Sequence, residues 1–159
     1  MTSLILATLA LTATPAHAEI SPCYNPGSGE KAEAFMEAYL ATHSDGDTTD
    51  FVDVFAPGYV NHNPLMDVDY ANYVGLMTLM FNAFPDLTYQ VEQVVAQGDT
   101  IALYYSWTGT HRGDFMGYGA TGNVVYGQGM EIHLVEDCEI VETWNMADLN
   151  GFFLQIQTP

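Results

Sequence analysis

Apolar side chains recur every three or four residues in three segments near the start of the chain, which is the spacing of an amphipathic helix. The first segment runs from Ser28 to Ser44 and is ended by Gly46. Asp47 is placed to cap a short second helix, which Pro57-Gly58 would end. A third helix follows and stops before Pro85. Its inward face is expected to carry Tyr70, Tyr73, Val74, Met77, Phe81 and Phe84.

Beyond the third helix, apolar and polar residues alternate, which is typical of β-strands. Extended segments are expected at 59–63, 87–91, 100–111, 123–136 and 139–145. The stretch 113–122 holds four glycines and is expected to be a loop. Residues 148–157 return to the helical spacing and predict a closing helix. Helices first and antiparallel strands afterwards predict an α+β fold in a single domain.

The first 18 residues have the pattern of a secretory signal peptide. An apolar run from Leu4 to Leu11 is followed by Ala16-His17-Ala18, a small-x-small cleavage site. The run is too short to span a bilayer, so no membrane insertion is expected after cleavage. Residues 19–159 would then form an exported domain, periplasmic or secreted. A buried N-terminal strand is the alternative interpretation of the same run.

The charge of the chain is strongly one-sided. Twenty Asp and Glu side chains face only two basic ones, Lys31 and Arg112, which gives a formal charge of −18. Such a chain repels nucleic-acid phosphates and anionic lipids, so neither is expected as a partner. Hydrophobic residues make up 48% of the sequence, which indicates a packed core rather than an acidic disordered tail.

Cys23 and Cys138 are the only two cysteines. An even number in an exported protein favours a disulfide, which would join the mature N-terminus to a turn near the C-terminus. Two separate buried thiols are the alternative.

Several short motifs occur in a fixed order along the chain. They are Tyr59-Val60-Asn61-His62-Asn63-Pro64, Phe84-Pro85-Asp86-Leu87, Gly98-Asp99, Gly109-Thr110-His111-x-Gly113-x-Phe115-x-Gly117, Thr121-Gly122, Ile140-Val141-Glu142-x-Trp144 and Asp148. In this order and spacing they resemble the SnoaL-like polyketide cyclases of the nuclear transport factor 2-like superfamily. The resemblance implies a cone-shaped, curved antiparallel sheet packed against three N-terminal helices, with an apolar pocket inside. It also implies a homodimer formed through the open face of the sheet.

The resemblance further implies that Asp148 is the acid/base residue for an aldol closure. Its position just before a helical pattern equally suits a helix N-cap. His133 and Glu131 are two residues apart on one strand and so share a face. They could face the pocket, where His133 would donate to a substrate oxygen or orient Asp148 and Glu131 would contact the substrate. The alternative is a solvent-facing charged pair.

Four further residues are candidates for the pocket, each with an ordinary structural alternative. His62 lies in a turn motif, where it could form a wall of the pocket and stabilise an enolate or simply hold the turn. His111 begins the glycine-rich segment and could lie at the pocket mouth or in a plain hairpin. Trp107 and Tyr39 could line a pocket for a flat hydrophobic molecule or belong to the core.

None of the histidines and acidic residues has the local spacing of a zinc site, and no phosphate loop or dinucleotide motif occurs. No metal or cofactor is therefore expected. The sequence predicts a lyase- or isomerase-type enzyme that takes a proton from a carbon next to a carbonyl of a small hydrophobic substrate. A noncatalytic small-ligand-binding or interaction module on the same fold is the alternative.

Overall fold

The computed structural model describes residues 23–24 and 29–157. The predicted signal peptide and its cleavage site lie outside the described residues. Among the helices that are described, none is long and apolar enough to cross a lipid bilayer.

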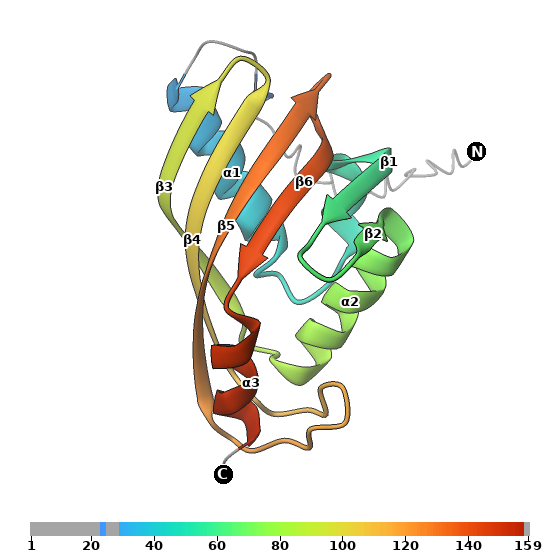
Figure 1. The fold of residues 1–159 in the computed structure, drawn as a ribbon, viewed down its shortest axis with the longest axis vertical. Helices are drawn as coiled ribbons and strands as arrows, with labels where there is room; N and C mark the ends of the chain where they lie inside the picture. Colours follow the sequence, from blue (N-terminus) through green and yellow to red (C-terminus); the bar gives the residue numbers. More distant parts are fainter. Residues whose placement is uncertain (1–22, 25–28, 158–159) are drawn as a thin grey trace, which may run out of the picture.

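Helices and strands follow one another along the chain nearly as the apolar pattern predicts (Figure 1). In order, the described elements are α1 (Gly29–Thr42), the 3₁₀ helix η1 (Thr49–Asp53), β1 (Phe55–His62), β2 (Asp67–Asp69), α2 (Tyr70–Ala83), β3 (Thr88–Gln97), β4 (Thr100–Thr110), β5 (Val124–Glu136), β6 (Glu139–Ala147) and α3 (Leu149–Gln157).

The strands form one curved, open sheet in the order β2-β1-β6-β5-β4-β3. All neighbours are antiparallel except β1 and β6, which run parallel. β4 and β5 are the longest strands and bend along their length (Figure 1). Shifts of register in β3–β4 and β5–β6 add to this curvature, because a bulge bends the strand that holds it. The predicted α+β fold is confirmed.

The second predicted helix is shorter than expected. It is the 3₁₀ helix η1, and Phe55 already belongs to β1, which continues through Pro57-Gly58 instead of ending there. The β1–β6 register shifts between Phe55 and Val60, so Pro57 lies where the ladder is interrupted and needs no N–H to donate. Asp47 still bonds locally, since its side chain accepts from the Thr49 N–H at 2.7 Å.

One face of the sheet and the helices together bury the core. Ile101 and Leu103, which alternate along β4 and so share its inner face, are almost fully buried. α1 packs on β3, and α2 packs on β1. Beyond the end of β6, α3 lies beside β5. The Gln155 side chain of α3 accepts from the Tyr126 N–H and donates to the Tyr126 carbonyl, which are the two bonds that a neighbouring strand would make. These contacts hold α3 at the open end of the sheet.

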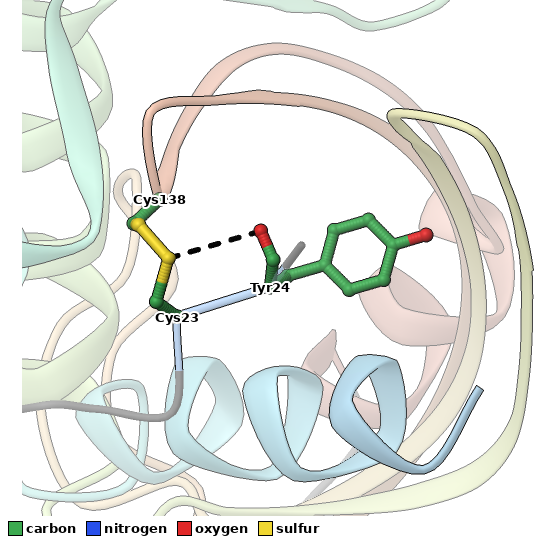
Figure 2. Close-up of a disulfide and its surroundings, with 3 residues drawn as sticks. All are labelled: Cys23, Tyr24 and Cys138. Atoms are coloured by element: carbon green, nitrogen blue, oxygen red, sulfur yellow. Dashed lines mark hydrogen bonds between the residues drawn. A yellow bond between two sulfur atoms is a disulfide. The ribbon is translucent and has the colours of Figure 1, made fainter. Parts of the chain in front are cut away.

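The predicted disulfide between Cys23 and Cys138 is present (Figure 2). It joins residues 115 positions apart, with their Cα atoms 4.8 Å from each other. The neighbouring Tyr24 is buried, and its hydroxyl donates to the Gly98 carbonyl at 2.6 Å. The N-terminal segment is thus fixed both to the β5–β6 turn and to the β3–β4 turn.

Candidate functional site

A cavity of about 300 Å³ lies on the inner side of the sheet. Aromatic and aliphatic side chains from α1, α2, α3 and the strands β2, β3, β4 and β6 form most of its wall, as expected for a small-molecule site. The predicted lining residues Tyr39 and Trp107 are both part of this wall. The other large rings around it are Tyr73, Tyr89, Tyr105, Phe115, Phe152 and Phe153. Two carboxylates, Glu131 and Asp148, also line it.

Glu131 forms the polar end of the cavity and is only 5% exposed. Its Oε2 accepts the Tyr39 hydroxyl at 2.9 Å, and its Oε1 accepts the Asn145 amide at 2.6 Å. The Tyr105 hydroxyl lies 3.5 Å from Oε1, at the limit of a hydrogen bond. The expected common face of Glu131 and His133 therefore points inward and not to solvent, because both side chains are buried.

His133 lies behind Glu131, fully buried and absent from the cavity wall. Its Nε2 is 3.2 Å from Glu131 Oε2 without the alignment of a hydrogen bond, and its Nδ1 is 2.9 Å from the Thr143 hydroxyl. Burial alone would raise the pKa of Glu131. The neighbouring His133, with smaller contributions from His43 and Asn145, outweighs burial and leaves that pKa below its ordinary value.

His43, at the end of the first predicted helical segment, also lines the cavity, although it was not among the predicted site residues. Its Nε2 lies 2.8 Å from the Tyr73 hydroxyl, and its Nδ1 lies 2.9 Å from the Tyr39 carbonyl. Burial lowers the pKa of His43 to about 4, so its imidazole is neutral at neutral pH. The apolar periodicity that revealed the helix gave no sign of this polar contact, because the partner Tyr73 is 30 residues away.

Asp148 is exposed at the edge of the cavity, directly after β6. Its Oδ1 accepts the Gly151 N–H at 2.9 Å, which is the N-cap contact that the sequence predicts for α3. Its Oδ2 has no hydrogen-bond partner among the described residues. Asp148 thus caps a helix and lines the cavity at the same time, so both interpretations of this residue agree with its position.

A second, more open groove of about 690 Å³ adjoins the cavity. The residues that line both hollows are Tyr89, Trp107, Gly127, Gln128, Asp148 and Phe152. Asp148, which is exposed, therefore lies where the cavity meets the groove.

Two glycines of β5 make room for the large rings of β4. A Cβ at Gly127 would collide with the indole of Trp107, and a Cβ at Gly129 would collide with the Tyr105 hydroxyl. Both rings can therefore lie across the inner face of the sheet and shape the cavity.

His62 does not reach the cavity, although Asn61 and Asn63 on either side of it do. Its Nδ1 lies 2.8 Å from Asp67 Oδ1, its Nε2 lies 3.5 Å from Glu142, and its ring stacks on Trp144. The contact with Asp67 is the main reason that the pKa of His62 is raised. Alternation along β1 turns His62 to the outer side, because neighbouring residues of a strand face opposite ways.

His111 also lies away from the cavity wall. It is fully buried, its ring stacks on Phe84, and its Nδ1 is 3.1 Å from the Thr121 hydroxyl. Its backbone bonds with Asn123 and Gly122 close the base of the glycine-containing loop. The geometry thus matches the plain hairpin alternative and not a place at the pocket mouth.

Within the described part of the chain, no three His, Cys, Asp or Glu side chains come together closely enough to hold a metal ion.

Comparison with known proteins identifies the family. The sequence profile of the SnoaL-like polyketide cyclases matches residues 33–156, so the chain belongs to this family. No curated protein sequence matches the chain.

Solved structures of similar proteins have the same fold. AclR from Streptomyces galilaeus, described as a candidate hydroxylase, is 28% identical with a TM-score of 0.75; the match covers 81% of this chain and 97% of AclR. IdmH from Streptomyces antibioticus, a candidate polyketide cyclase, is 26% identical with a TM-score of 0.67, covering 76% and 94% of the two chains. A SnoaL-like protein from Jannaschia sp. CCS1 is 19% identical with a TM-score of 0.70, covering 78% and 90%.

Proposed function

We propose that this protein is an exported cyclase- or isomerase-type enzyme whose cavity binds a small hydrophobic ketone. In this proposal Asp148 takes a proton from the carbon next to the carbonyl. Family membership supports a cyclase/isomerase-type or ligand-binding domain, and the mostly apolar cavity supports a small-molecule ligand.

The position of Asp148 is the observation that carries the proposal. A general base must reach its substrate with an oxygen that is not already engaged. Asp148 lines the cavity, and only its Oδ1 is used by the helix cap. Glu131 is less suited to this role, because its oxygens accept bonds from Tyr39 and Asn145 and its pKa is lowered.

The enolate oxygen that forms needs a hydrogen-bond donor, and the Asn63 amide of the cavity wall can supply it. Asn63 uses its Oδ1 to accept the Leu65 and Met66 N–H groups, which turns its NH₂ group the other way. The Asn145 amide is less suited, because its NH₂ group is directed at Glu131 Oε1 at 2.6 Å and at the Tyr105 oxygen at 3.5 Å. We assign this role to Asn63 and not to His62 or His133, which do not line the cavity.

Export is part of the proposal and rests on two features. Residues 1–18 have the pattern of a signal peptide, and disulfides persist mainly in oxidising compartments. The bond between Cys23 and Cys138 is compatible with a periplasmic or secreted protein.

The proposal is tested by proton exchange, which needs no knowledge of the natural substrate. The probe is 6-hydroxy-1-tetralone, an apolar ring ketone that also carries a hydroxyl, incubated with the protein in D₂O while deuterium uptake next to the carbonyl is followed by mass spectrometry. The protein is expected to accelerate the uptake. Asp148→Asn should reduce that acceleration about 100-fold or more, because general base catalysis typically contributes that much. The affinity for the ketone should stay within about twofold, because asparagine caps a helix as well as aspartate.

Asp69→Asn is the matched control. Asp69 caps α2 by accepting the Asn72 N–H, but it does not line the cavity. This variant should exchange at the wild-type rate. Full exchange by Asp148→Asn would remove Asp148 from the mechanism.

A noncatalytic binding module is the second candidate, and the bonds of Glu131 favour it. The carboxylate at the buried end of the cavity is held by Tyr39 and Asn145, an arrangement suited to binding without turnover. Binding of the ketone by the wild-type protein without any exchange would establish this alternative and contradict the enzyme.

A further inference from the structure

The buried end of the cavity has hydrogen bonds of a defined direction. An ionised carboxylate only accepts hydrogen bonds, so every polar group that contacts Glu131 must point a hydrogen at it. The Tyr39 and Tyr105 hydroxyls do so at 2.9 and 3.5 Å. Each hydroxyl has a single hydrogen. With that hydrogen directed at Glu131, both tyrosine oxygens offer lone pairs to anything that approaches from the cavity.

Burial and charge keep the two hydroxyls in this state. Burial, reinforced by the charge of Glu131, raises the pKa values of Tyr39 and Tyr105 well above the ordinary range. Their hydrogens are therefore retained at any ordinary pH, and their orientation persists.

Neither lysine nor arginine supplies a hydrogen-bond donor to the cavity. Neither basic residue of the protein lines the cavity: Lys31 is exposed on α1, and Arg112 lies 3.4 Å from Asp86 at the surface. His133 contacts Glu131 from behind the wall. The donor group beside them, the NH₂ of Asn145, is directed at Glu131 Oε1 and the Tyr105 oxygen. Toward the cavity, these contacts leave the Glu131 carboxylate and two tyrosine oxygens, all of which are acceptors.

We infer that the ligand carries a hydrogen-bond donor, a hydroxyl or an N–H. This donor lies on the part of the ligand that is deepest in the cavity, where it contacts Glu131, Tyr39 and Tyr105. An apolar molecule that offers only a carbonyl or ether oxygen there would place acceptor against acceptor, which costs the full desolvation of both groups. The inference rests on the proposed use of this cavity as the ligand site. It narrows the substrate class to apolar ketones that also bear a donor group.

The test compares small aromatic probes that differ only in their polar group, with dissociation constants measured by isothermal titration calorimetry. 2-Naphthol carries a neutral donor, 2-naphthylmethylamine a charged one, and 2-methoxynaphthalene no donor. Because hydrogen bonds to charged acceptors are among the stronger ones, 2-naphthol should bind about tenfold or more tightly than its methyl ether. Comparing the affinity of the amine with that of 2-naphthol then shows whether the cavity prefers a charged donor or a neutral one. Tighter binding of either compound supports the inference, because both carry a donor.

Variants connect the preference to the named groups. In Glu131→Gln the advantage of 2-naphthol over the ether should fall below about threefold, because the charged acceptor is gone. Glu92→Gln is the matched control, since Glu92 accepts the Ser106 hydroxyl outside the cavity wall, and it should keep the full advantage. Tyr105→Phe, which leaves the charge in place, should reduce the advantage part of the way.

The comparison of ligands in the wild-type protein is decisive even if a variant fails to fold. Equal affinities for 2-naphthol and its methyl ether, or no binding of 2-naphthol, would overturn the inference. A clear preference for 2-naphthol in a protein that exchanges no protons would leave the inference standing and remove the enzymatic proposal.

Discussion

At the scale of single residues, the buried polar groups of this protein are held in place by one another. Glu131 binds Tyr39, whose backbone carbonyl contacts His43, and His43 in turn contacts Tyr73. Glu131 of β5, Tyr39 of α1, His43 just after α1 and Tyr73 of α2 are thus linked in one polar network beside a mostly apolar cavity. Buried groups linked in this way are costly to disturb, since each loss leaves another group without its partner.

His43 should make the stability of the fold depend on pH in a defined window. Burial lowers its pKa to about 4, whereas the unfolded chain takes up the proton near pH 6.5. A lowered histidine pKa means that stability is lost as the pH falls from about 6.5 to about 4. We expect wild-type protein to lose about 2–3 kcal/mol more unfolding free energy over this window than His43→Gln. Urea titrations of both chains at pH 6.5 and 4.5 measure the difference.

The carboxylates of the acidic surface titrate in both chains, so the difference between the chains isolates His43. Identical losses in wild type and variant would show that His43 takes up a proton in the folded state as easily as in the unfolded one.

At the scale of elements, the apolar period located the long helices and strands closely but misjudged the short pieces around β1. α1 and α2 carry enough apolar residues at helical spacing to be recognised without their neighbours. The segment around Phe55 is too short for the spacing of its apolar residues to distinguish a helix from a strand. Its parallel pairing with β6 makes it a strand. The short strand β2 exists only as the antiparallel partner of β1. Short elements are decided by pairing partners that lie far away in the sequence.

The disulfide links two elements of the fold, and its contribution to the unfolding free energy can be measured by removing it. A link across 115 residues restricts the unfolded chain strongly, so reduction or Cys23→Ser/Cys138→Ser should lower the unfolding free energy by roughly 3–5 kcal/mol. Thermal unfolding of the wild type with and without a reducing agent measures the loss. The double variant serves as the control, because the reducing agent should not change its midpoint. A wild-type midpoint that stays constant while free thiols appear would show that the link does not stabilise the fold.

At the scale of the whole molecule, the sheet leaves an apolar surface on its outer side. Met130 and Met146 are paired across β5 and β6, as are Ile132 and Trp144. These four side chains, the outer patch, are 44–66% exposed. A contiguous exposed apolar surface of this kind suits a protein interface. We propose that it forms the homodimer that the family resemblance implies.

The dimer should depend on salt and on the outer patch. Two subunits that each carry a formal charge of −18 repel one another, and salt screens that repulsion. Sedimentation equilibrium should therefore show tighter association in about 1 M salt, where the Debye length is about 3 Å, than in dilute buffer. Met146→Glu should abolish association. Val52→Glu, at a similarly exposed apolar residue of η1, should leave it unchanged. A wild-type chain that stays monomeric at every salt concentration would contradict the proposal.

The sequence by itself determined the order of the main helices and strands, the α+β class, the cysteine pair and the family. These follow from local periodicity, residue count and ordered motifs, which do not require the fold to be known. The sequence also indicated four pocket candidates that line the cavity, namely Tyr39, Trp107, Glu131 and Asp148. Only the tertiary structure decided that His62 and His111 lie elsewhere, that His133 stands behind Glu131, and that His43 joins the buried network. The physical reason is that a side chain's partners come from elements 30 to about 100 residues away, while periodicity reports only which way each residue of one element faces.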